Sequence, residues 1–176
     1  MARYKLTKHK FLSDEEYAHL EQILEKFKHK DPRNCTLLWL AMHTGARAQE
    51  LLNLKPQDLD NKNLSVYVSG LKEGCDRDIP IPKWLFRRVM TEVQPASKFI
   101  FPITYNRFRQ IWVEYRPAHK GLHCLRHTFA IRLYKRTKDI RLVQRALGHR
   151  WLTTTEIYMQ FDYSQQELRK LIVGRN

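Results

Sequence analysis

Residues 121–133 read GLHCLRHTFAIRL, and the spacing of their apolar side chains decides the fold class. Leucine or phenylalanine recurs at i, i+3, i+7 and i+11, which is the period of one face of an α-helix. His123 and Arg126 lie about 100° round the helix from that face. We therefore expect both at the rim of a buried surface, held in place yet able to reach a ligand. The residues of the apolar face are Leu122, Leu125, Phe129 and Leu133.

Helical spacing recurs on both sides of this stretch. A capping box of serine and glutamate predicts a first helix over residues 14–27. A second helix is expected over residues 35–44, ending at Gly45, because glycine suits the left-handed turn that closes helices. A third helix begins close to Arg47. The remaining predicted helices cover residues 83–93, 106–116, 139–147 and 164–173.

Between residues 64 and 81 the apolar period changes to that of a strand. Every second residue is aliphatic in LSVYV (64–68) and again in DIPI (78–81), with GLKEG between them. This pattern predicts a β-hairpin whose connection contains Lys72. Pro80 and Pro82 fit a strand end or a sheet edge. The expected fold class is mostly α with a small antiparallel β-sheet (α+β).

Length and charge limit the organisation and the partners. The 176 residues, 43% of them hydrophobic, suffice for one domain with a core. Lysine and arginine total 32 against 18 acidic residues, a net charge of +14 spread along the chain, which favours nucleic acid over a membrane surface. No stretch approaches the roughly 20 apolar residues of a membrane span, and no signal peptide is recognisable. We expect an intracellular protein without a membrane partner.

The cysteines and histidines do not suggest a metal or a disulfide framework. Cys35, Cys75 and Cys124 are odd in number and widely separated. The eight histidines contain no HExxH-like arrangement. We therefore expect reduced thiols, no metal and no cofactor.

Four polar features could handle a phosphate, and each also has a plainer interpretation. In HTGARAQELLNL (43–54), Arg47 stands at a helix start, where its guanidinium and exposed backbone N–H groups suit a phosphate. Glu50 could orient Arg47, or the two could form a surface ion pair. Lys72 could reach a DNA groove or be a solvated turn residue. The HxxR pair of His123 and Arg126 could equally lie on a solvated helix face.

The fourth feature is LGHRWLTTTEIYMQ (147–160). His149 follows the glycine that ends one helix, and the threonines 153–155 offer caps for a short helix that carries Tyr158. A tyrosine in such a short helix is more mobile than one in a packed core. The plainer alternative makes Ile157 and Tyr158 both core residues.

In their order along the chain, these features resemble the tyrosine recombinase (phage-integrase) family. The segments that carry the resemblance are TGARAQELLNL, SGLKEGCDRDIPIP, LHCLRHTFAIRL and LGHRWLTTTEIYMQF, within residues 12–161. The resemblance implies a tyrosine recombinase catalytic-domain fold and an enzyme that cleaves and rejoins DNA without a metal. Tyr158 would attack the scissile phosphate and form a 3′-phosphotyrosine, while Arg47 and Arg126 would clamp the non-bridging oxygens. Tyr163 fits the spacing less well.

The other residues take supporting roles in this scheme. His123 would assist proton movement at the tyrosine, and His149 would hydrogen-bond the phosphate. Lys72 would be the general acid for the departing 5′ oxygen, and Glu50 a supporting residue.

The resemblance also implies partners. The substrate would be double-stranded DNA, bound by a homotetramer on paired sites, with accessory DNA-bending proteins, in the cytoplasm at the nucleoid of a bacterial or phage host. The segment 163–176 could dock on a neighbouring protomer through Leu168, Leu171 and Ile172, or pack on its own domain.

The expected layout is a basic arm over residues 1–12 and a catalytic domain over residues 13–176. We expect the family's usual N-terminal core-binding domain to be absent from this layout, either because the chain is an excised catalytic domain or because it is one of the small recombinases that lack that domain. The reaction could be integration, excision or inversion. Relaxation of DNA as by a type IB topoisomerase, or non-catalytic DNA binding, are the alternatives.

Overall fold

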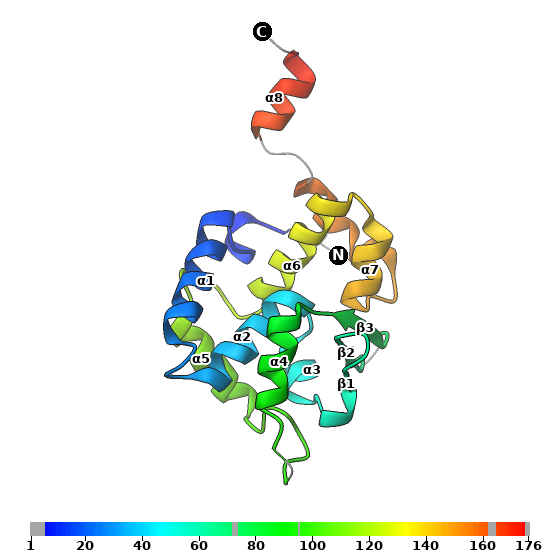
Figure 1. Ribbon diagram of the computed structural model, residues 1–176. Helices are drawn as coiled ribbons and strands as arrows, with labels where there is room; N and C mark the ends of the chain where they lie inside the picture. Colours follow the sequence, from blue (N-terminus) through cyan, green and yellow to red (C-terminus); the bar gives the residue numbers. More distant parts are fainter. Residues whose placement is uncertain (1–5, 72–73, 95, 162–164, 175–176) are drawn as a thin grey trace.

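The structure is a computed structural model that describes residues 6–71, 74–94, 96–161 and 165–174, with no account of the side chains of 165–168 (Figure 1). The described residues form mostly helices, with one small antiparallel sheet at one side of the domain in Figure 1, which confirms the predicted fold class. None of the helices formed by these residues has the length and apolar content of a membrane span.

The first two helices show how local sequence sets the boundaries. Helix α1 spans Asp14–Phe27 as predicted, because Ser13 and Glu16 form the capping box. Helix α2 spans Pro32–Thr44 and so begins three residues earlier than expected. Proline is suited to the first helical position because the N–H that it lacks would have no partner within the helix there. Nearly every residue of α2 is buried, and it packs against its neighbours α1, α4 (Lys83–Thr91) and α6 (Cys124–Thr137).

Gly45 closes α2 and lets α6 approach it. Its φ of 59° is left-handed, and its N–H donates to Ala41 O over 3.2 Å. A Cβ at Gly45 would stand 2.3 Å from Cδ1 of Phe129 on α6. A side chain at this position would therefore push the two helices apart.

The predicted hairpin is present. Strands β2 (Ser65–Val68) and β3 (Arg77–Pro80) pair antiparallel, with Val66 opposite Ile79. A third strand, β1 (Leu59–Asp60), pairs with β2 on its other side and was too short for the alternation to reveal. Pro80 ends β3 at the sheet edge, as predicted.

The remaining elements complete the domain. They are η1 (Lys8–Lys10), α3 (Ala48–Leu52), η2 (Pro56–Asp58), α5 (Tyr105–Tyr115), α7 (Ile140–Leu147), η3 (Leu152–Thr154), η4 (Glu156–Phe161) and α8 (Gln165–Val173), where η marks a 3-10 helix. In Figure 1, α8 projects away from the rest of the molecule, and its Leu171 and Ile172 are exposed.

Helix α6 joins two apolar cores. Leu125 lies in the larger core, formed mainly by α1 to α5, while Leu133 lies in a smaller one with α7 and η4. Leu6, within the predicted arm, is buried in the smaller core, and the Leu12 N–H donates to Thr128 Oγ1 over 2.8 Å. Helix α6 begins only at Cys124, so Leu122 precedes the helix that was expected to carry it.

Candidate active site

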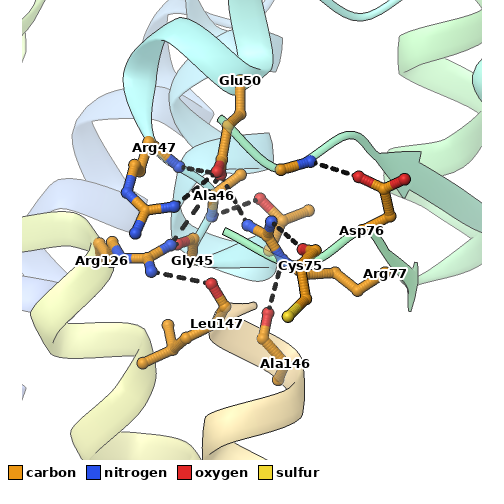
Figure 2. A network of polar contacts seen from close by, with 12 residues as sticks. Gly45, Ala46, Arg47, Glu50, Cys75, Asp76, Arg77, Arg126, Ala146 and Leu147 are labelled. Atoms are coloured by element: carbon orange, nitrogen blue, oxygen red, sulfur yellow. Dashed lines mark hydrogen bonds and ion pairs between the residues drawn. The ribbon is translucent and has the colours of Figure 1, made fainter. Parts of the chain in front are cut away.

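One buried carboxylate organises three arginines (Figure 2). Arg47 caps α3, and Glu50 accepts both its backbone N–H and its Nη1 over 2.8 Å each. Arg77 Nη2 donates to Glu50 Oε2 over 2.7 Å, and Arg126 Nη1 lies 4.0 Å from the same oxygen. Burial acts to raise the pKa of Glu50, but the hydrogen bonds and charges of Arg77 and Arg47 outweigh it and hold that pKa below its ordinary value.

Arg126 also joins the ends of two helices. Its Nη1 donates to Gly45 O over 2.7 Å, and its Nη2 donates to Leu147 O over 2.8 Å (Figure 2). Both carbonyls end helices, where the helix dipole favours a cation. Burial, with the charge of Arg47 nearby, lowers the pKa of Arg126 to about 10, so it stays protonated at neutral pH.

The expectation that His123 and Arg126 share an accessible rim is wrong for the arginine. Arg126 is only 3% exposed, whereas His123 is exposed at the N-cap of α6. The reason is that Arg126 points between the C-terminal ends of α2 and α7, whose carbonyls need a donor.

Arg77 was not predicted. It is 8% exposed, and its Nε donates to Ala146 O on α7 over 3.0 Å. Its position on β3 has the same parity as that of the buried Ile79, and this was the signal that could have revealed its burial. Arg77 thus connects the sheet to Glu50 and to α7.

The segment after the hairpin connection is fixed to the end of α7. The Cys75 N–H donates to Gly148 O over 3.0 Å, and a Cβ at Gly148, whose φ is 64°, would stand 2.5 Å from Cys75 O. On the other side, a Cβ at Gly74 would lie 3.1 Å from Arg47 Nη1. The chain that leaves the connection therefore runs beside Arg47.

His149 is half-buried and neutral. Its Nδ1 lies 2.9 Å from Oγ1 of the fully buried Thr155. Burial, and then the charges of Arg126, Arg47 and Arg77, lower the pKa of His149 to about 3. If Thr155 donates to Nδ1, the single N–H of the neutral ring is at Nε2.

Tyr158 is only 2% exposed and belongs to the smaller core, which agrees with the plainer of the two interpretations of this residue. Its N–H donates to Thr155 O over 3.0 Å in the 3-10 turn. Residues i and i+3 of such a turn share one side, so both face inward. The Tyr158 hydroxyl lies 3.0 Å from Nδ1 of His127, a residue that the sequence analysis missed although it directly follows Arg126.

Five of these side chains, Arg47, Arg126, His127, His149 and Tyr158, line one cavity of about 900 Å³. We call Arg47 and Arg126, with Glu50 and Arg77 behind them, the arginine wall. His127, His149, Thr155 and Tyr158 form the tyrosine wall. His123 also lines the cavity, and Lys72 and Tyr163 lie outside the described residues. Two guanidiniums facing neutral imidazoles and a phenol suit a phosphate group.

No group of three or more histidine, cysteine, aspartate or glutamate side chains gathers as a metal site within the described ranges. Cys35 and Cys124 are buried thiols, and Cys75 is an exposed one.

The fold is a mostly helical domain whose cavity holds two arginines and a tyrosine, and its sequence matches the Phage integrase family over residues 10–165. The chain therefore belongs to this family, and the resemblance seen in the sequence is confirmed.

Similar proteins include tyrosine recombinase XerH of Campylobacter jejuni, 32% identical over 90% of this chain and 50% of the relative. Tyrosine recombinase XerA of Pyrococcus furiosus is 33% identical over 85% of this chain and 56% of the relative. The chain thus spans about half the length of these relatives. The crystal structure of XerH site-specific recombinase bound to palindromic difH substrate, a post-cleavage complex, matches 94% of this chain and 53% of that chain, with 26% identity and a TM-score of 0.74.

Proposed function

We propose that this chain carries the DNA-breaking and rejoining activity of a site-specific recombinase, working in integration, excision or inversion. The observation that carries the proposal is the convergence of Arg47, Arg126, His123, His149 and Tyr158 on one cavity. The similar XerH, described as a site-specific recombinase bound to its difH substrate, supports it.

The arginine wall would stabilise the phosphate during the reaction. As the phosphorus takes on a fifth oxygen, negative charge builds on the non-bridging oxygens, and preorganised donors there lower the barrier. Arg126 is held by two carbonyls and Arg47 by Glu50, so neither guanidinium has to reorganise as the charge develops. Glu50 supports both arginines without lining the cavity.

The tyrosine wall would supply the nucleophile. A phenol with an ordinary pKa of about 10 attacks poorly until a base or a positive field assists it. The two arginines provide the field, and His123 would assist proton movement. His149, with Nδ1 engaged by Thr155, would donate Nε2–H to a phosphate oxygen. Attack forms the O–P bond of a 3′-phosphotyrosine and breaks the bond to the 5′ oxygen.

Lys72 would protonate the departing 5′ oxygen. The closeness of Gly74 to Arg47 supports this role, because the same connection carries Lys72. A lysine ammonium is a suitable acid for an alkoxide leaving group.

The proposed partner is double-stranded DNA, in keeping with the net charge of +14. We further propose a homotetramer on paired sites, assisted by DNA-bending proteins, at the nucleoid of a bacterial or phage host. The exposed Leu171 and Ile172 on the projecting α8 support docking on a neighbouring protomer.

A plasmid assay tests this function. The chain is incubated with a supercoiled plasmid that holds two copies of the DNA flanking its own gene, and with a plasmid that lacks them. Recombinant products from the first plasmid alone are expected. Relaxation of both plasmids without recombinants would instead indicate a topoisomerase, and binding without either product a non-catalytic DNA-binding protein.

A further inference from the structure

The hydroxyl of Tyr158 contacts a histidine outside the predicted set. His127 is 6% exposed on α6, directly after Arg126, and its Nδ1 lies 3.0 Å from the Tyr158 oxygen. The two rings are 5.8 Å apart between centroids and tilted by 54°. The proposed nucleophile is thus held by a buried imidazole on the helix that also carries one of the phosphate-binding arginines.

His123 lies on the other side of His127. Their rings meet edge to face, with centroids 4.7 Å apart and planes at 88°. The imidazole that was expected to serve the tyrosine therefore packs against a second imidazole, and it is this second one that hydrogen-bonds the hydroxyl.

The protonation state of His127 bears on which group donates in its hydrogen bond with Tyr158. Burial, and then the charges of His123, Arg126 and Lys10, lower the pKa of His127 to about 3, so the ring is neutral at working pH. A neutral imidazole has one N–H and one lone pair. A phenol O–H is a much stronger acid than a neutral imidazole N–H. With this N–H on Nε2, Nδ1 accepts the hydrogen bond from the phenol O–H, and this is the tautomer that the proposal below requires.

We propose that His127 is a positioning residue for the nucleophile: Nδ1 accepts the phenolic O–H of Tyr158 and turns the oxygen lone pairs toward the cavity. This inference rests on the proposed function, because it concerns the tyrosine that would attack the phosphate. His127 acts through Tyr158, and its proposed effect is on the geometry of attack and not on DNA affinity.

Asparagine and glutamine at position 127 provide a matched test, because each places an amide where one of the two ring nitrogens of His127 stands. The amide of asparagine at position 127 stands where Nδ1 stands, whereas the amide of glutamine stands where Nε2 stands. His127→Asn should form covalent adducts on a nicked suicide duplex at a single-turnover rate close to that of the wild type. His127→Gln should be slower by about 10- to 100-fold, because a misplaced reacting atom costs up to about 100-fold in rate. DNA affinity should stay the same in both.

Equal adduct rates for His127→Asn and His127→Gln would overturn the inference while leaving the proposed function intact. The absence of covalent adducts from the wild-type chain would instead overturn the proposed function itself. The two failures are therefore distinguishable.

A measurement without DNA covers the case in which a variant folds poorly. In protein labelled with carbon-13 at the tyrosine Cζ, the Tyr158 resonance is assigned by its loss in Tyr158→Phe. His127→Gln should shift this resonance and leave the other tyrosines in place. An unshifted Tyr158 resonance would overturn the inference, and so would movement of all tyrosine resonances together.

Discussion

The two walls of the cavity differ in how firmly their functional groups are held. On the arginine wall, Arg126 donates to two helix-end carbonyls, and the buried carboxylate of Glu50 pairs with Arg47 and Arg77. Charge-assisted hydrogen bonds of this kind are roughly twice as strong as neutral ones. The groups that would meet the phosphate are therefore fixed before DNA arrives.

On the tyrosine wall, Tyr158 lies in the short 3-10 helix η4, and the polar contacts join neutral groups. Thr155 reaches His149 over 2.9 Å, and His127 reaches Tyr158 over 3.0 Å. Hydrogen bonds in 3-10 turns have poorer geometry than those of α-helices. The difference teaches that the electrostatic part of the site is rigid, whereas the nucleophile is placed by a few separable contacts.

Replacing Arg126 should have the largest effect on covalent adduct formation. Arg126→Ala leaves the carbonyls of Gly45 and Leu147 without their donor and takes a guanidinium from the phosphate, so covalent DNA adducts should disappear while some DNA binding remains. Adduct formation on a suicide duplex and a gel-shift assay measure the two properties. Arg132→Ala, on the same helix but paired with Asp14 at the surface, is the control for loss of charge and should keep adduct formation.

Replacing the carboxylate of Glu50 by an amide should have a smaller effect, which we expect in the unfolding free energy of the domain. Glu50→Gln leaves three guanidiniums without their counter-charge, and breaking a buried ion pair costs about 3–5 kcal/mol of unfolding free energy. Urea unfolding at neutral pH measures this loss. Glu25→Gln, whose side chain is 60% exposed, should change the stability little.

The unfolding free energy should also depend on pH through the ionisation of Glu50. The folded pKa of Glu50 lies below its ordinary value of 4.5, so its contribution is complete above that value and is lost as pH falls through the lowered pKa. Urea unfolding from about pH 6 to about pH 3 should show a steeper loss in the wild type than in Glu50→Gln. Parallel curves would contradict the role given to this carboxylate.

A change on the tyrosine wall should affect rate more than stability. Thr155→Val removes the hydroxyl beside His149 and keeps the shape, at a cost of about 1 kcal/mol in unfolding free energy. Loss of the His149 orientation should slow adduct formation by about 10-fold, within the limit of about 100-fold that misplacement of a catalytic group can cost. Thr137→Val removes a comparable hydroxyl contact, to Leu133 O on α6, away from the cavity, and should leave the rate unchanged.

Chelation should have the smallest effect. Because Arg47 and Arg126 would supply the positive charge at the phosphate, EDTA should leave the rate of adduct formation unchanged. Loss of adducts in EDTA, restored by adding a divalent cation, would mean that the arginine wall is not sufficient.

Patterns among neighbouring residues predicted the bounds of several helices and the position of the hairpin well. The capping box set α1, the glycine at 45 set the end of α2, and alternation set the hairpin, because each of these signals depends on neighbours in sequence. Strand β1 escaped because two residues cannot show a period.

Contacts between distant segments could not be read in the same way. The parity of Arg77 indicates burial, but its partner Glu50 lies 27 positions away. His127 is next to a predicted residue, yet its contact with Tyr158 spans 31 positions and depends on how η4 folds under α6. The burial of Arg126 likewise follows from two helix ends that meet only in the folded chain.

The central claim is that Tyr158 bonds covalently to DNA within this cavity. The chain is trapped on nicked suicide duplexes that tile the DNA flanking its own gene, and the modified residue is mapped by peptide mass spectrometry. The account predicts a nucleotide adduct on the peptide that contains Tyr158, and none in Tyr158→Phe. An adduct on any other residue, or one that persists in Tyr158→Phe, would contradict it.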